Sequence, residues 1–362
     1  MSFKIYTEPD INRLLATFGG EIPDRVPYLE SLIEDKHVEH ILGKPAGNTL
    51  GATGDVAKGI SDEAAAARPM DPKDYIRMCK TLGQDAMIIE ALWAPLRKIG
   101  KDEKLRIIND RSIKNRKDLE KVVPPTQEDI NLKIKFVREY IQAAKGTNIG
   151  VTLFTGCFFQ TNYEFVVGFV DFMPKIIEDL EFLEELMDIA VDYYVKLVEA
   201  ACKEGIHFLW AADDVAYRSG LFVRPELFKR IWRPQMEKIF APALERGIPV
   251  MFHSDGKLDS IMDMLIDMGV SCVHPMDPYC IDYRDYKKRY GKRVALAGNT
   301  DIAFPLAKGT PEDVRRDVIE HLKVMKPGGR YIFCSSHSIV NYIPLENYEA
   351  MINTFHEHAS YD

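Results

Sequence analysis

The sequence predicts an α/β protein with the (β/α)8 architecture of a TIM barrel. Short apolar runs of strand length recur along the chain, and they are continuous instead of alternating, as in strands that a parallel sheet buries on both faces. Segments with a 3.6-residue apolar period separate these runs, so strand and helix alternate. Of the 362 residues, 46% are hydrophobic and 28% charged, and we expect a single domain over residues 1–362.

The elements follow one another in a regular order. Residues 1–20 predict a helical extension, with an amphipathic helix over residues 11–18. Eight apolar runs then predict the strands, at residues 26–29, 86–92, 150–154, 206–211, 249–252, 270–273, 294–297 and 331–334. Periodic segments between them, such as 174–202 and 225–245, predict helices. The second of these opens with Pro225, which suits the first turn of a helix.

Residues 35–72 do not fit this alternation of strand and helix. The segment is rich in glycine, and we expect a long excursion over the barrel mouth, where loops of this length usually act as lids or partner surfaces. An open doubly wound sheet is the competing architecture. It would need a glycine-rich dinucleotide loop after the first strand, and the sequence has none there.

Charge and composition exclude several classes of partner. The net charge is -8, from 47 basic and 55 acidic residues, and the basic residues do not cluster, so we expect neither nucleic acid nor an anionic membrane as a partner. No apolar run approaches the roughly 18 residues of a membrane span, and the start lacks a secretory apolar region, so we expect a cytoplasmic protein. The six cysteines show no C-x-x-C spacing, which favours buried thiols.

The chemistry is expected where the strands end, because active sites of parallel barrels are built at the carboxyl ends. The run Val250-Met251-Phe252 breaks there into His253, Asp255 and Gly256. Polar residues follow other strands in the same way: Glu90, Asp213, Asp214, Asp277, Asn299, Asp301, Cys334 and His337. Imidazole with carboxylate or thiolate suits Zn²⁺, and three protein ligands with an open position would make the site catalytic.

Each of these residues also has a plain structural alternative. His253 alone is as readily a core histidine as a ligand, and a core role is favoured for His274 inside its strand. Any single acid can cap the helix that follows it, which we favour for Asp171 and Asp301. The aromatic residues near the strand ends are individually core residues, but together they suit a planar apolar substrate. They are Trp93, Phe154, Phe158, Phe159, Trp210, Tyr217, Phe222, Tyr279 and Tyr342.

Five motifs in register carry a resemblance to a known family. They are Pro23-Asp24-Arg25-Val26-Pro27, Phe252-His253-Ser254-Asp255-Gly256, Gly298-Asn299-Thr300-Asp301, Gly309-Thr310-Pro311-Glu312-Asp313-Val314, and Ser336-His337-Ser338-Ile339 with Pro344-Leu345-Glu346-Asn347. From about Gly19 onward the chain resembles the uroporphyrinogen decarboxylase superfamily, which also contains cobalamin-dependent methyltransferases. The resemblance implies the same (β/α)8 barrel.

Departures from the decarboxylases argue against uroporphyrinogen as the substrate. Those enzymes carry arginines after the first strand that hold propionate groups, and an aspartate after the second strand that binds pyrrole nitrogens. Here the first region, residues 29–35, is acidic, and Leu92 stands at the aspartate position. An octa-anionic porphyrinogen would meet repulsion where it needs cations.

The chain is more similar to the methyltransferase branch of this superfamily than to the decarboxylases. Its zinc-binding members have a His-x-Cys after strand five and a second Cys after strand eight, and His253, Asp255 and His337 stand at these places. The resemblance therefore implies a zinc site in which oxygen and nitrogen replace sulfur, with Cys334 as an alternative ligand. Residues 212–217 and 220–222 are similar to O-demethylase components, which act on methyl ethers.

The resemblance thus implies methyl transfer from a small donor, an aromatic methyl ether, to the Co(I) of a separate corrinoid protein. It implies catalytic roles for Asp214, His253, Asp255 and His337, either around Zn²⁺ or with a histidine as general acid. The expected substrate contacts are Glu90, Trp93, Phe158, Phe159, Asp213, Tyr217, Phe222, Asp277 and Asn299. Since the sequence has no Asp-x-His-x-x-Gly segment, the cobalamin is expected on the partner, and a homodimer, usual among relatives, stays open.

Three rival functions stay open. A decarboxylase or other lyase of a small carboxylic acid would need a cationic anchor, which Arg218 and Arg224 offer. A zinc-dependent hydrolase would use the same ligands to activate water. A binding protein without catalysis would keep only the barrel.

Overall fold

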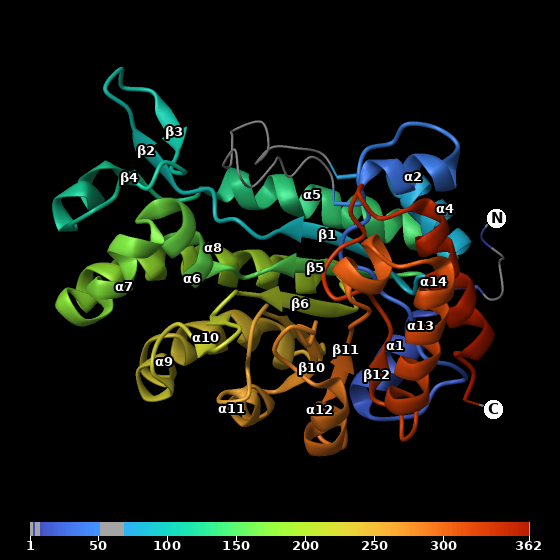
Figure 1. Cartoon of the computed structure of the whole chain (residues 1–362). Helices are drawn as coiled ribbons and strands as arrows, with labels where there is room; N and C mark the ends of the chain where they lie inside the picture. Colours follow the sequence, from blue (N-terminus) through green and yellow to red (C-terminus); the bar gives the residue numbers. More distant parts are fainter. Residues whose placement is uncertain (1–2, 4–7, 51–68, 362) are drawn as a thin grey trace.

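A parallel sheet forms the centre of the computed structural model, which describes residues 3, 8–50 and 69–361 (Figure 1). In spatial order its strands are β1 (Ala86–Ala91), β5 (Gly150–Thr155), β6 (Phe208–Ala212), β9 (Val250–His253), β10 (Val270–His274), β11 (Ala295–Ala297) and β12 (Tyr331–Ile332). Each strand overlaps one of the predicted apolar runs. The expected α/β fold with a parallel sheet is therefore confirmed.

The first expected strand, residues 26–29, is reduced to isolated contacts with both edges of the sheet. Tyr28 forms a parallel bridge with Phe333, just after β12. On the other side, the carbonyl oxygen of Tyr28 accepts a hydrogen bond of 3.0 Å from the amide of Asp85, just before β1. The segment lies between the two edge strands without forming a regular strand of its own.

Helices alternate with the strands as predicted. Among the residues that follow position 70, the α-helices of more than four residues are α4 (Pro72–Leu82), α5 (Gln127–Ala144), α7 (Phe169–Glu178), α8 (Leu180–Glu204), α9 (Pro225–Ile231), α10 (Arg233–Leu244), α11 (Met262–Asp267), α12 (Tyr283–Tyr290), α13 (Pro311–Met325) and α14 (Leu345–His358). The helix expected over 174–202 is two helices, because Asp179 leaves the helical conformation and caps α8 through the amide of Phe182. The helix expected over 225–245 is likewise divided, at Trp232.

Shorter elements complete the connections. They are the 3₁₀ helix η2 (Arg116–Lys121), the helix α6 (Phe158–Thr161), the π-helical turns η3 (Asn162–Val166) and η4 (Ile302–Ala307), and the hairpin strands β7 (Ala216–Tyr217) and β8 (Gly220–Leu221). Asp301 accepts a hydrogen bond from the amide of Ala303 at the start of η4, so the predicted cap is present. Asp171, by contrast, lies in the first turn of α7 and pairs with Lys114 instead of capping the helix.

Successive residues of each strand alternate between two apolar clusters. Phe208 and Trp210 on β6 and Met251 on β9 belong to an inner cluster that the curved sheet surrounds. Their neighbours Leu209 and Phe252 belong to the larger cluster between the sheet and its helices. Because the side-chain period of a strand is two, His253 and His274 point to the same inner side as Met251 and Cys272.

A helix is present where residues 11–18 predict one, and it covers the amino-terminal end of the strands. In α1 (Ile11–Gly19), the side chains of Ile11, Leu14 and Phe18 join the inner cluster. The ring of Phe18 lies 5.2 Å from that of Phe208, at the start of β6. The amino-terminal side of the sheet interior is thus filled, which leaves the carboxyl ends for chemistry.

A small antiparallel sheet that the sequence did not predict is inserted between β1 and α5. It consists of β2 (Arg97–Ile99), β3 (Leu105–Ile107) and β4 (Val122–Val123), in the order β3-β2-β4. In Figure 1 it stands out from the body at the upper left, near α7. Its strands have two or three residues and several exposed side chains, so they carry too few apolar residues for a visible period.

The excursion over residues 35–72 lies only partly within the described residues. Its first part forms α2 (Asp35–Leu42), where His40 Nε2 lies 2.8 Å from the Glu349 carboxylate on α14. Residues 51–68 are outside the described residues, so a cap over the barrel mouth stays a prediction. Within the described ranges, no helix combines the length and apolar character that a membrane span requires.

The buried imidazole of His356 joins α14 to the rest of the chain in its neutral form. Its Nε2 lies 2.8 Å from the Leu82 carbonyl oxygen, and its Nδ1 lies 3.1 Å from the Arg25 guanidinium. Nε2 therefore donates and Nδ1 accepts. Burial lowers the pKa of His356 to about 4, and the Leu82 carbonyl opposes this shift less strongly.

This buried histidine predicts acid destabilisation in a defined range. Below pH 6.5 the unfolded chain binds a proton at His356, while the folded chain leaves this imidazole neutral. The free energy of unfolding therefore falls as the pH is lowered to about 4. Between pH 6.5 and 5 we expect a loss of about 1–2 kcal/mol from this residue. Urea denaturation at both pH values measures it. The His356→Gln variant should have a shallower pH dependence, and an unchanged slope would contradict the assignment.

Candidate functional site

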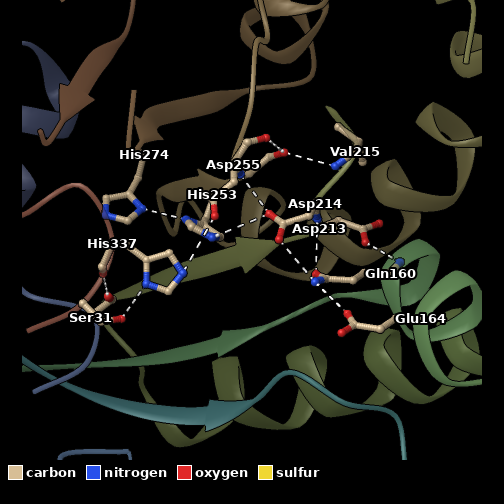
Figure 2. Close-up of polar contacts among 12 residues, drawn as sticks. Ser31, Gln160, Glu164, Asp213, Asp214, Val215, His253, Asp255, His274 and His337 are labelled. Atoms are coloured by element: carbon tan, nitrogen blue, oxygen red, sulfur yellow. Dashed lines mark hydrogen bonds and ion pairs between the residues drawn. The ribbon is translucent and has the colours of Figure 1, made fainter. Parts of the chain in front are cut away.

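Three strands of the sheet bring the candidate site together at their carboxyl ends. In the parallel register, His253 of β9 lies between Ala212 of β6 and His274 of β10. The residues that leave these strands, Asp214 and Asp255, therefore start at the same level. Figure 2 shows their side chains converging with His253.

Two carboxylates and one imidazole form the centre of the site. Asp214, His253 and Asp255 each offer a ligand atom, and these atoms lie within 4.8 Å of one another. His253 Nε2 is 3.8 Å from Asp214 Oδ1, which also accepts a hydrogen bond of 2.8 Å from the Asp255 amide. Of the predicted metal ligands, the structure thus gathers His253 and Asp255, together with Asp214, which was predicted to be catalytic.

His337 lies beside this group. Its Nε2 is 3.8 Å from Asp255 Oδ2, and its ring centre is 6.5 Å from that of His253. Its side chain is 52% exposed, against 14% for His253. The hydroxyl of Ser31 donates to the His337 carbonyl oxygen, which ties this loop to the segment after residues 26–29 (Figure 2). His337 thus presents an accessible imidazole to the edge of the group.

The electrostatics of the site favour a cation. Burial raises the pKa of the Asp255 carboxyl, His253 opposes this, and the adjacent Asp214 carboxylate adds to the increase. Among the described residues, the ion pairs of Asp214 and Asp255 go to histidines and not to Lys or Arg. Two neighbouring carboxylates with an imidazole provide the oxygen and nitrogen donors that Zn²⁺ accepts. The residues present therefore fit a divalent metal ion.

Asp213 and Asp214 are adjacent in the sequence, but their side chains have different partners. Asp213 is fully buried, and its carboxylate accepts hydrogen bonds of 2.8 Å from the Gln160 amide and 2.9 Å from Trp232 Nε1. Burial raises the pKa of this carboxyl well above its usual value, although the amide and indole donors oppose the shift. Asp213 therefore anchors α6 instead of facing the group around His253.

Two residues that the sequence did not indicate orient Asp214. The side-chain amide of Gln160 donates from Nε2 to Asp214 Oδ2 at 3.2 Å and to Glu164 Oε2 at 3.1 Å. Gln160 lies on α6 and Glu164 on η3, in a loop whose course no periodicity reveals. His274, predicted to be a core residue, is fully buried, yet its Nδ1 lies 2.7 Å from His253 Nδ1.

The predicted aromatic contacts separate into two groups. Phe158 and Phe159 are fully buried, where they pack against Trp232 and Phe172. Tyr217 and Phe222 instead line a cavity of about 530 Å³. The rest of its lining is Arg111, Lys114, Tyr163, Glu164, Gly168, Phe169, Val170 and Asp171. The hydroxyl of Tyr163 donates to the Asp214 carbonyl oxygen at 3.0 Å, so this cavity adjoins the loop that carries Asp214.

The remaining predicted residues lie at the margins of the group or away from it. Trp93 packs edge-on against Phe165 at 4.8 Å. Burial raises the pKa of Glu90, on β1, to about 7. The Asp277 carboxylate accepts from the Tyr279 amide, while buried Asn299 pairs with His321 and the Met276 carbonyl.

Cys334 is not among the converging ligand atoms of Asp214, His253 and Asp255. Its thiol is fully buried in the inner cluster, and burial raises its pKa well above the usual value. A thiol that resists deprotonation is a poor zinc ligand, since the thiolate is the form that binds.

We predict that the purified chain binds one equivalent of Zn²⁺. His253→Ala should lose this binding without loss of fold, because it removes the single nitrogen among the converging ligand atoms. Isothermal titration with Zn²⁺, on protein prepared without chelator or metal resin, measures the stoichiometry, and circular dichroism checks the fold. The exposed imidazole of His358 provides the control variant, His358→Ala. Unchanged binding by His253→Ala would contradict the site.

Comparison with known proteins gives a family match over most of the chain. The model of the uroporphyrinogen decarboxylase (URO-D) family matches residues 98–358. The uroporphyrinogen decarboxylase of Methylobacillus flagellatus is 38% identical over 82 residues, 23% of this chain and 23% of that protein. That of Pseudoalteromonas translucida is 34% identical over 183 residues, 49% of this chain and 48% of that protein. The chain thus spans between about a quarter and half of the length of these relatives.

A solved structure has the same fold over nearly its whole length. It is a methyltransferase from Methanosarcina mazei, which aligns with 97% of this chain and 99% of its own, at a TM-score of 0.66 and 17% sequence identity. This likeness concerns the fold alone.

Proposed function

Because the chain belongs to the uroporphyrinogen decarboxylase family, we propose that it transfers a methyl group from a small aromatic methyl ether to the Co(I) of a separate corrinoid protein. The observation that carries the proposal is the convergence of Asp214, His253 and Asp255 at the carboxyl ends of the strands. The related fold of the Methanosarcina methyltransferase is consistent with it.

The difficult part of this reaction is the departure of the ether oxygen. The bond between the methyl carbon and the oxygen breaks, the oxygen keeps the electron pair, and the methyl carbon takes a new bond from the pair that Co(I) supplies. The protein must therefore stabilise an alkoxide or phenoxide as it forms, which is an electrostatic task.

His253, Asp214 and Asp255 would hold Zn²⁺, with His337 at the edge of the set. The bound ion would act as a Lewis acid toward the developing oxyanion. Gln160 keeps Asp214 turned toward His253 through its hydrogen bond to Oδ2. His337, half-exposed and next to Asp255, would hold a proton at Nε2 and give it to the leaving oxygen. Such a general acid contributes about 10²- to 10⁴-fold.

An aromatic donor suits the cavity next to the site. Tyr163, Phe169, Tyr217 and Phe222 contribute four rings to its wall, and the rings of Tyr217 and Phe222 meet at 4.5 Å. Aromatic walls favour a planar ring by edge and face contacts. We assign Tyr217 and Phe222 to substrate binding, together with Glu90, Trp93 and Asp277. The other predicted contact residues would not touch the substrate but would hold the surrounding loops in place: Phe158, Phe159, Asp213 and Asn299.

The proposal also takes the sheet as a closed (β/α)8 barrel. Support comes from the segment around Tyr28, which makes backbone hydrogen bonds to Phe333 on one side and to Asp85 on the other. Closure would bring Ser31 and His337 to the same rim as His253. The corrinoid partner would approach at this rim.

Decarboxylation of a small carboxylic acid is the main rival, because the curated relatives are named uroporphyrinogen decarboxylase. Its anchor would be Arg218, whose guanidinium lies over the Tyr279 ring at 4.1 Å. A zinc-dependent hydrolase would use the same ligand set, but it would turn over without any corrinoid.

The proposal predicts demethylation that depends on a corrinoid acceptor. Purified chain, reduced cobalamin and a panel of methoxylated aromatic compounds should give methylated cobalamin, followed by its visible spectrum, and the free phenol. His253→Ala should lower the rate at least about 10²-fold, as loss of an electrostatic catalyst does. His337→Gln should lower the rate less than His253→Ala does.

Three outcomes separate the proposal from its rivals. Phenol release without cobalamin would indicate a hydrolase, and CO₂ release from carboxylated substrates would indicate a lyase. Methyl transfer that His253→Ala leaves unchanged would contradict the proposed site.

A further inference from the structure

Within the described residues, the side chain of His274 makes one polar contact, and that contact is with His253. It is the last residue of β10 and stands opposite His253 in the parallel register, on the same face of the sheet. The two Nδ1 atoms are 2.7 Å apart, and the ring centres are 4.9 Å apart (Figure 2). His274 is fully buried.

The other nitrogen of His274 has no partner among the described residues. Its Nε2 is buried without a hydrogen bond, and its ring meets the indole of Trp210 edge-on at 5.1 Å. Leaving a buried polar atom unpaired is unfavourable, because the atom has lost its hydrogen bonds to water. An apolar side chain would fill this position without that cost, so the contact with His253 calls for an explanation beyond packing.

Counting protons on the two rings connects this contact to the metal group. A hydrogen bond between two ring nitrogens needs one proton between them. When His253 Nε2 gives its lone pair to a cation, the proton of the neutral ring is on Nδ1. Among the described residues, the acceptor within hydrogen-bonding distance of that proton is His274 Nδ1. The opposite direction would place a proton on His253 Nε2, which could then no longer bind a metal.

We propose that His274 is a positioning residue that accepts the Nδ1 proton of His253 and so holds the Nε2 lone pair toward Asp214 and Asp255. The inference rests on the metal site of the proposed function. Partners that bind the second nitrogen of a ligating histidine fix its tautomer and ring orientation, and their loss typically weakens metal binding about 10- to 100-fold. Here the partner is a second, buried histidine.

The experiment measures Zn²⁺ affinity by competition with a chromophoric chelator. His274→Phe fills the space but removes the acceptor, and we expect it to bind Zn²⁺ about 10- to 100-fold more weakly. His274→Asn places an amide oxygen near the position of Nδ1 and should restore most of the affinity. Trp210→Phe is the control, because it disturbs the same packing without touching the hydrogen bond.

A second measurement follows the proton itself. In ¹⁵N-histidine-labelled, zinc-loaded protein, the His253 Nδ1 signal, assigned with His253→Ala, should be that of a protonated nitrogen with a slowly exchanging proton. In His274→Phe this proton should exchange faster, and in His274→Asn it should again be protected.

The outcomes keep this inference separate from the metal site itself. If the wild type binds Zn²⁺ and His274→Phe binds it as tightly, with an unchanged Nδ1 signal, the metal site stands and the role of His274 is wrong. Equal weakening by Trp210→Phe would reduce His274 to a packing residue. If the wild type binds no Zn²⁺, the metal site and this inference fall together.

Discussion

The parallel register of β6, β9 and β10 is the constraint on which the candidate site depends. It places Ala212, His253 and His274 at the same level, and the pleat turns both histidines inward. The amide of Asp213 bonds to the His253 carbonyl, and that of Ser254 to the His274 carbonyl, so the ladder continues for one residue past the strands. A slip of one residue in β9 would turn His253 into the helix layer and dissolve the group.

Within this frame, neighbouring residues divide structural and chemical work. Asp213 is turned toward α6 and Trp232, where amide and indole donors satisfy it, and it thereby fixes the backbone of Gln160. The side chain of Gln160 returns to Asp214. Asp213 thus orients Asp214 through Gln160, which lies more than fifty positions earlier in the chain. Hydrogen bonds from Gln160 to Oδ2 and from the Asp255 amide to Oδ1 limit the freedom of Asp214, and its Oδ1 faces His253.

Much of this arrangement follows from the sequence, and the remainder depends on side-chain packing. Buried parallel strands need apolar runs, so the strands and the polar residues at their ends could be predicted, and His253, Asp255 and Asp214 meet as a result. The turn after Gly156 could not be predicted, and it buries Phe158 and Phe159 while it delivers Gln160. In the sequence, a buried histidine with apolar neighbours resembles any other core residue until its partner is known. The contact of His274 with His253 could therefore not be predicted.

Acidic side chains of residues 29–35 lie against the carboxyl-terminal loop in the structure. The family match begins at residue 98, after the segments that depart from the decarboxylases. Glu30 is buried against Ser335, whose hydroxyl donates to it at 2.6 Å, and burial raises the pKa of Glu30 to about 7. Glu34 accepts from the Asn341 amide. These acids connect the segment to the carboxyl-terminal loop, so repulsion by them is weaker than their number suggests. Residues 29–35 contain no arginine, so this segment offers no cation to a substrate carboxylate.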